Sequence, residues 1–284
     1  MSNRRKFITS TVAGIAGLSL LPAVNIFGAD RFDYQQPGPA VRPKLRFALI
    51  SDLHYGQPGT DYDTNAANMV KWLNAEHAVN HLDLIIFNGD LVHDQVPLLK
   101  VLKTKYLDFF SVPYFTLPGN HDHADSAVWK DAFGYADNYS MERGDIGFVL
   151  ANTADTRGEQ VCPDLLFLKA SLDKYVDKQL VFVVLHIPVV QWLEAEKKFF
   201  LYCPETVDLL HKYPNVKAVF HGHDHFLDGV RYTGKLPHFF DAHLGGNWGT
   251  DYRGYRIVEV SSTNEVTTYQ VNASKNPRLN TNKI

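Results

Sequence analysis

The sequence has little cysteine and no excess of positive charge. Two cysteines among 284 residues are too few for a disulfide scaffold or a thiolate metal site. The formal net charge of −3 argues against a general nucleic-acid-binding protein, which would normally be basic. Internal repeats and low-complexity segments are also absent. These absences exclude disulfide-rich, repetitive and strongly basic classes of protein.

The overall composition is that of an ordinary soluble globular protein. Hydrophobic residues make up 45% of the chain and charged residues 21%, which argues against a disordered or fibrous protein. The length allows one large α/β domain or two small ones. Histidine is abundant, with 13 residues, and the positions of these histidines carry the functional signal.

Residues 1–29 are predicted to be an export signal that is not part of the fold. A basic head is followed by an uncharged stretch and a small-residue exit at Ala29. The pair Arg4 and Arg5 resembles the twin-arginine export motif, which implies the twin-arginine export machinery as a partner and a periplasmic or extracellular location. The alternative is a retained membrane anchor, because the segment from Phe7 to Ala29 carries no charge and could span a bilayer.

The remaining chain is expected to hold one domain at 45–272, between a linker at 30–44 and a tail at 273–284. Three prolines in segment 30–44 favour a tether. Cleavage after Ala29 would leave 25 basic residues (28 − 3) against 31 acidic ones, so the mature chain would be more acidic still. Cys162 and Cys203 could pair in an exported protein, but we expect two separately buried thiols.

Strands and helices alternate along this domain. We predict strands at Leu45–Ile50, Leu82–Phe87, Pro113–Leu117, Gly147–Ala151, Leu180–Leu185 and Val216–Phe220. Helices are expected at Ala66–Val79, Pro97–Phe109, Asp164–Tyr175 and Glu205–Lys212. A β-meander should follow at Gly229–Tyr232, Pro237–Ala242, Tyr255–Val260 and Val266–Tyr269. This order predicts a layered sandwich of the α/β or α+β class.

Polar residues of one kind follow five of the predicted strands. The five motifs are Asp52-Leu53-His54, Gly89-Asp90, Gly119-Asn120-His121-Asp122, His186 and Gly222-His223-Asp224-His225. Each motif lies just past the carboxyl end of a strand, which is the edge where open α/β sheets bind ligands. Carboxylates, an amide and imidazoles without thiolates suit Mn, Fe, Zn or Co. A single such motif is often a turn or a helix cap, but five in this arrangement indicate a metal centre.

The order of these motifs resembles that of the calcineurin-like metallophosphoesterases. The resemblance runs from Leu45 to about Ala242, and it implies a four-layer αββα sandwich of two mixed sheets flanked by helices. It also implies two metal ions that share a bridging carboxylate and a hydroxide, which attacks a phosphate ester in line. The first ion would be held by Asp52, His54, Asp90 and His225. The second ion would be held by Asp90, Asn120, His186 and His223.

The same resemblance assigns catalytic roles to two further residues. His121 would contact the phosphate and protonate the leaving oxygen, a general-acid role that suits imidazole. Asp122 would orient His121 through a hydrogen bond. The pattern departs from that of protein Ser/Thr phosphatases, purple acid phosphatases and the large periplasmic nucleotidases. It looks like that of the small phosphodiesterases, so we expect a small phosphodiester or phosphomonoester as substrate.

Two other functions remain as alternatives. A nuclease would use the same metals, but it would favour a basic groove, which the acidic mature chain disfavours. We therefore expect no stable nucleic-acid partner. A metal-free scaffold on the same fold would have lost ligand residues, and none of the implied ligands is missing.

Some neighbouring residues have less certain roles. His93, His123 and His221 flank the motifs, and we expect them to support the ligands or to be polar loop residues. The glycine-rich loop from Gly245 to Tyr252 could rim a substrate pocket or could be a hairpin turn with packed aromatic residues. The sequence does not indicate an oligomeric state.

Overall fold

The fold was analysed in a computed structural model, which describes residues 42–191, 199–226, 228–274 and 278–284. The predicted export signal and most of the predicted linker lie outside these residues. Within them, no helix is long and apolar enough to cross a membrane.

The first sheet contains six strands in the order β12-β11-β10-β1-β2-β3. β1 pairs in parallel with β2 and antiparallel with β10, so the sheet is mixed. The strands are β1 (Leu45–Ile50), β2 (Leu84–Asn88), β3 (Tyr114–Leu117), β10 (Gly254–Val260), β11 (Val266–Asn272) and β12 (Arg278–Lys283).

The second sheet also contains six strands, in the order β4-β5-β6-β7-β9-β8. Its central strands are parallel, and its two edge strands are antiparallel to their neighbours. The strands are β4 (Tyr139–Arg143), β5 (Ile146–Ala151), β6 (Leu180–Leu185), β7 (Val216–His221), β8 (Gly229–Thr233) and β9 (Leu236–Phe240).

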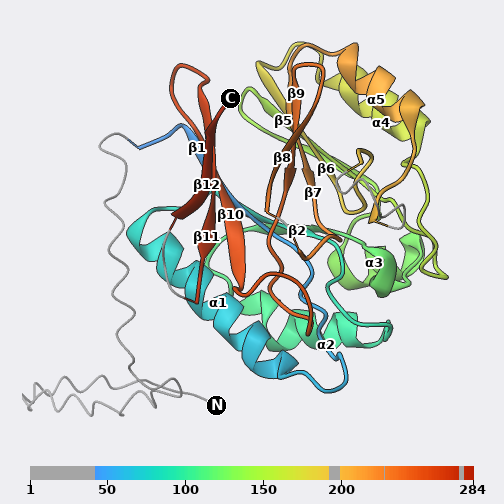
Figure 1. The fold of residues 1–284 in the computed structure, drawn as a ribbon, viewed down its shortest axis with the longest axis vertical. Helices are drawn as coiled ribbons and strands as arrows, with labels where there is room; N and C mark the ends of the chain where they lie inside the picture. Colours follow the sequence, from blue (N-terminus) through green and yellow to red (C-terminus); the bar gives the residue numbers. More distant parts are fainter. Residues whose placement is uncertain (1–41, 192–198, 227, 275–277) are drawn as a thin grey trace, which may run out of the picture. The chain divides into compact units, whose positions relative to one another are not determined.

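The two sheets pack face to face, and helices cover their outer faces (Figure 1). Side chains alternate along β1: Phe47 points between the sheets and Ala48 points to the helices. The Phe47 ring lies 5.2 Å from that of Phe148 in β5 and 5.4 Å from that of Phe182 in β6. These contacts confirm the predicted sandwich of two mixed sheets with flanking helices.

Within the described residues, three α-helices pack on the first sheet and two on the second. Those on the first sheet are α1 (Tyr62–Val79), α2 (Leu98–Lys105) and α3 (Ser126–Phe133). Those on the second sheet are α4 (Leu165–Lys174) and α5 (Pro204–His211). Two 3₁₀ helices, Leu107–Phe109 and Asn120–Asp122, complete the described helices.

The structure differs from the expected C-terminal meander. β9 joins the second sheet beside β7, whereas β10 crosses to the first sheet and pairs with β1. The segment expected as a tail contributes β12, which pairs with β11. The short elements α3 and β4 were not predicted either.

The expectation of two separate thiols is wrong, because Cys162 and Cys203 form a disulfide with a Cα–Cα distance of 5.8 Å. Cys162 precedes α4 and Cys203 precedes α5. Both helices pack side by side on the second sheet, which brings the segments before them together (Figure 1).

Candidate metal centre

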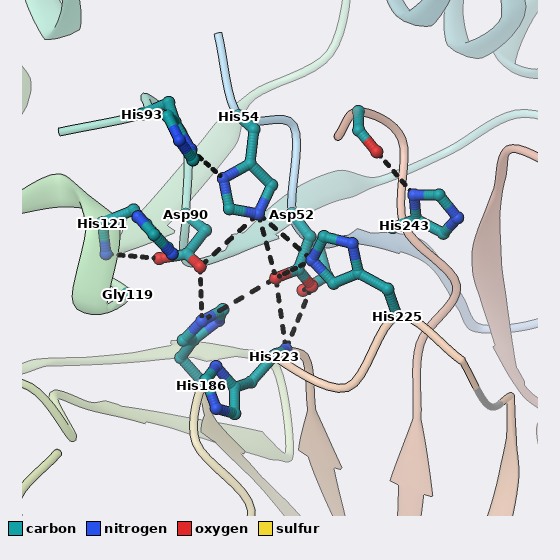
Figure 2. A network of polar contacts seen from close by, with 12 residues as sticks. Asp52, His54, Asp90, His93, Gly119, His121, His186, His223, His225 and His243 are labelled. Atoms are coloured by element: carbon teal, nitrogen blue, oxygen red, sulfur yellow. Dashed lines mark hydrogen bonds and ion pairs between the residues drawn. The ribbon is translucent and has the colours of Figure 1, made fainter. Parts of the chain in front are cut away.

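Six of the predicted ligands converge on one cluster, although they come from both sheets (Figure 2). Asp52 and Asp90 follow β1 and β2 of the first sheet, and His54 lies two residues after Asp52. The three remaining histidines follow β6 and β7 of the second sheet: His186, His223 and His225. The ends of parallel strands therefore bring distant parts of the chain to one place.

The first group of potential ligands consists of Asp52, His54 and His225. One ligand atom of each lies within 4.8 Å of the others, and all three side chains are buried. The Nε2 atom of His225 is 3.0 Å from Asp52 Oδ1 and 3.1 Å from His54 Nε2. These atoms could hold one metal ion.

The second group consists of Asp90, His186 and His223, whose ligand atoms also lie within 4.8 Å of one another. Asp90 Oδ2 is 3.3 Å from His186 Nε2 and 3.7 Å from His54 Nε2. This oxygen therefore lies between the two groups, where a bridging carboxylate would be needed.

Contacts outside the cluster orient several of the histidine rings. The Nδ1 atom of His186 donates to the backbone oxygen of Asn88 at 2.7 Å, so the Nε2 atom is the one that faces the cluster. The Nδ1 atoms of His54 and His225 likewise face outward, toward His93 Nδ1 at 3.0 Å and the Trp248 carbonyl at 3.4 Å. The Nε2 atoms are thus presented as ligands.

Asn120, the remaining predicted ligand, has a side-chain oxygen that could bind a cation. It begins the 3₁₀ helix after β3, and its Oδ1 atom is buried. Among the described residues no hydrogen-bond donor reaches this oxygen. A buried oxygen without a donor is costly unless a ligand satisfies it. Together with the imidazole and carboxylate atoms, it forms a ligand set suited to divalent transition metals.

The electrostatics of the cluster favour positive charge. Burial opposes ionisation of Asp52, but His225 and His186 hold its pKa well below the usual range. Burial also opposes protonation of His186, yet Asp90 and Asp52 raise its pKa to about 9. Burial lowers the pKa of His54 to about 3, so this ring stays neutral. Two buried carboxylates therefore stay ionised and attract a cation.

The backbone at the strand ends is unusual for non-glycine residues. Asp52, His54, Asp90 and His223 have positive φ angles of 56°, 48°, 50° and 68°. Each costs on the order of 1 kcal/mol, a kind of strain that often occurs at functional sites. Glycines in the motifs allow the close packing: a side chain at Gly119 would collide with Asp90, and one at Gly222 with Ser51.

His121 lies beside the cluster, but its expected partner is wrong. Its Nδ1 atom is 2.7 Å from Asp94 Oδ1. Asp122 is fully buried and accepts hydrogen bonds from the backbone N–H groups of Gly119 at 2.8 Å and Val92 at 2.9 Å. Asp122 therefore stabilises the loop, because both of its carboxylate oxygens accept hydrogen bonds from backbone N–H groups. Asp94, and not Asp122, orients His121. Asp94 was visible in the sequence four residues after Asp90, but it was given no role.

The flanking histidines have different neighbours. His93 contacts His54 and stacks on His121, with ring centroids 4.6 Å apart, and these three rings form a further group of possible ligands. His123 contacts Asp94 at 3.0 Å. His221 is buried, and its Nε2 atom lies 3.0 Å from His238 Nδ1.

The glycine-rich loop packs directly on the first ligand group. The Trp248 ring stacks on His225, with centroids 4.5 Å apart and an angle of 7° between the planes. The Arg253 guanidinium donates to the backbone oxygens of Gly245 at 2.8 Å and Gly246 at 3.0 Å. The loop is therefore a wall of the metal centre.

Comparison with known proteins agrees with this geometry. The family model described as calcineurin-like phosphoesterase matches residues 45–227. A probable glycerophosphodiester phosphodiesterase, GpdQ of Arcobacter nitrofigilis, is 28% identical over 160 residues, which cover 50% of this chain and 56% of that protein. A 3′,5′-cyclic-nucleotide phosphodiesterase of a Nostoc species, alr5338, is 26% identical over 191 residues, which cover 64% of this chain and 71% of that protein. The chain thus spans just over half the length of the first relative.

The fold is shared with solved structures. A dimetal phosphatase from Danio rerio aligns with a TM-score of 0.66 at 14% identity, covering 85% of this chain and 99% of that one. Identity this low shows the fold alone, but the family model covers well over half of the chain. The chain therefore belongs to the calcineurin-like phosphoesterase family, which confirms the class of enzyme expected from its sequence, a phosphoric ester hydrolase.

Proposed function

We propose that this protein is an exported phosphoesterase with two metal ions, and that it hydrolyses small phosphodiesters. The position of Asp90 Oδ2 carries the proposal, because this oxygen lies between His54 of one ligand group and His186 of the other. A carboxylate can bridge two cations, whereas a neutral imidazole cannot. When bound, two divalent ions supply Lewis acidity and lower the pKa of water.

The residues of the chain would divide the work between binding and proton transfer. The two ligand groups would hold the ions, which would supply positive charge for the phosphoryl oxygens. His121 is placed to give a proton to the leaving oxygen, and Asp94 holds its ring in place. Burial opposes protonation of His121, but Asp90 and Asp94 outweigh it and raise the pKa of the ring. This shift favours the proton-bearing form of the ring, which a general acid needs.

The relatives support diesters as the substrate class, since both are named phosphodiesterases. The test is to measure hydrolysis of a panel of phosphate esters by the purified wild-type protein and its Asp90→Asn variant with added Mn²⁺. We expect hydrolysis of bis(nitrophenyl) phosphate and of glycerophosphodiesters, with less activity on nitrophenyl phosphate and none on plasmid DNA. Asp90→Asn should fold and lose turnover by about 10³-fold or more, because the shared ligand is neutral.

Two outcomes would contradict the function. Wild-type protein that binds metal but hydrolyses no ester in the panel is not this enzyme. Full activity in Asp90→Asn would show that the bridge does not matter.

We also propose export through the twin-arginine machinery. The Cys162–Cys203 disulfide supports an oxidising compartment, where such bonds persist. Arg4→Lys combined with Arg5→Lys should hold the full-length precursor in the cytoplasm, because the arginine pair is the feature that the receptor reads. Fractionation and immunoblotting measure this. Normal export of the double variant would favour a general secretory signal, and an unshortened wild-type chain that resists salt washing would favour a membrane anchor.

A further inference from the structure

His93 lies between a predicted metal ligand, His54, and the proposed proton donor, His121 (Figure 2). Its Nδ1 atom is 3.0 Å from the Nδ1 atom of His54. Its ring stacks on that of His121, with ring centroids 4.6 Å apart and an angle of 14° between the planes. Only 17% of the His93 side chain is exposed. One imidazole therefore contacts both the first ligand group and the proposed acid.

Backbone hydrogen bonds fix the position of His93. Its own N–H donates to the backbone oxygen of Tyr55, the residue after His54, at 3.0 Å. The N–H of the next residue, Asp94, donates to the backbone oxygen of His121 at 3.0 Å. The segment that carries His93 is thus attached to both neighbouring segments, so its two ring contacts are built on a fixed backbone.

The contact between His54 and His93 has a definite direction once His54 binds an ion. The Nε2 atom of His54 lies 3.1 Å from His225 Nε2 and 3.7 Å from Asp90 Oδ2, so it is the atom that faces the cluster. A neutral imidazole that gives its lone pair to a metal carries its proton on the other nitrogen. The Nδ1 atom of His54 would then donate to the bare Nδ1 atom of His93, whose Nε2 lies 3.8 Å from Asp94 Oδ2.

The same direction argues against a third ion at the group formed by His54, His93 and His121. The ligand atoms of these rings lie within 4.8 Å of one another. His54, however, has no second lone pair to give while its Nε2 atom serves the first ion. The arrangement therefore fits a hydrogen bond and a ring contact better than a further metal site.

We propose that His93 is a positioning residue with two separable effects: it accepts the hydrogen bond that orients His54, and its ring supports His121. This inference rests on the ligand groups and the acid of the proposed function. Losing the outer hydrogen bond of a metal-binding histidine typically weakens metal affinity by about 10–100-fold. Losing a stacked ring would leave His121 freer to turn, and we expect this to lower the rate by about 2–10-fold.

The first test is calorimetric titration of metal-stripped protein with Mn²⁺ alone. His93→Phe keeps a ring but removes the acceptor, so binding of one ion should weaken by about 10–100-fold while the other changes by less than about threefold. His93→Asn removes the ring but places an amide oxygen near the position of Nδ1, so both affinities should stay within about threefold of wild type.

Matched controls are His81→Phe and His81→Asn. His81 precedes β2, whose other end leads to Asp90, and 48% of its side chain is exposed. Both control variants should bind two ions as the wild type does. Melting temperatures of the metal-free proteins check that each variant is folded.

The second test is kcat/KM for two diesters with Mn²⁺ in excess, so that both sites are filled. His93→Asn should lose about 2–10-fold on an alkyl diester and much less on an ester of nitrophenol, because only the alkyl leaving group needs a proton. His93→Phe keeps a ring beside His121 and should lose little on either ester.

Three results would overturn the inference. They are equal loss of an ion in His93→Asn and His93→Phe, weakening of both ions or of neither in His93→Phe, and equal slowing of the two esters in His93→Asn. A third Mn²⁺ in the wild type that is absent from His93→Phe would make His93 a metal ligand instead. Wild-type protein that binds two ions but hydrolyses no ester would contradict the proposed function. The difference in affinity between the Phe and Asn variants would still decide whether His93 orients His54.

Discussion

His121 and Asp94 form the contact on which acid catalysis would depend. Asp94 is half in solvent and bonds to the Nδ1 atom of the ring, so the second nitrogen can face a leaving group. His121 itself is partly exposed, unlike the buried ligand Asp90, which accepts its backbone N–H at 2.8 Å. The proposed proton donor and a proposed metal ligand are therefore adjacent but distinct.

Replacement of His121 by Ala separates acid catalysis from metal binding. We expect both ions to remain and the rate on an alkyl diester to fall by about 10²–10⁴-fold, the usual contribution of a positioned acid. An ester of nitrophenol should lose much less, because nitrophenolate leaves without a proton. kcat/KM for both esters measures this. Equal losses with unchanged metal content would mean that His121 only stabilises phosphate charge.

The residues of the cluster were predictable from the sequence, but their supporting contacts were not. Asp52, Asp90 and His186 follow apolar strands directly, so residue type and position point to the cluster before the fold is known. Asp94 reaches His121 through loop conformation, which no periodicity encodes. Asp122 was assigned to His121 by adjacency, but its side chain turns to the backbone of its own loop.

At the level of elements, the glycine-rich loop packs tightly against the segment that carries Asp52 and His54. A side chain at Gly245 would collide with the backbone oxygen of Leu53, between Asp52 and His54. The loop is held in this position by backbone hydrogen bonds from Leu244 to Ser51 at 3.1 Å and from Gly245 to Asp52 at 2.8 Å. Displacement of the loop would therefore move the first ligand group.

Replacement of Gly245 by Ala should weaken the binding of Mn²⁺ to the first ligand group by roughly tenfold or more, since the added methyl group displaces these ligands. Gly144→Ala is the control, because a side chain there meets open space at a φ of +59°. It should cost about 1–2 kcal/mol of stability through backbone strain and leave metal affinity unchanged. Calorimetry and thermal melting of both variants decide the matter. Unchanged metal affinity in Gly245→Ala would mean that the loop can shift without displacing the first ligand group.

The elements next to the site were the easiest to predict. Buried parallel strands such as β1 and β6 appear as continuous apolar runs, and their ends were placed within a residue. α3 was missed, although Asp125 caps it by accepting from the N–H of Val128. β12 was missed because its sequence, Arg278–Lys283, is polar, as an edge strand can be.

At the level of the whole molecule, the ligands are shared between the two sheets. Asp52 and His54 come from the first sheet and His225 from the second; Asp90 comes from the first and His186 from the second. The chain passes from one sheet to the other after β3 and returns after β9. Neither ligand group is complete until the two sheets have packed together. The order of the motifs in the sequence does not reveal that each group takes residues from both sheets.

The division of ligands between sheets has a thermodynamic consequence. An ion that needs residues from both sheets binds the native state and has no complete site in a half-folded chain. Its binding free energy is then added to the stability of the entire sandwich by mass action, about 2.7 kcal/mol when free metal is 100 times its Kd. The supply of metal would thus tune the stability of this protein as well as its activity, and a chelator would lower its melting temperature.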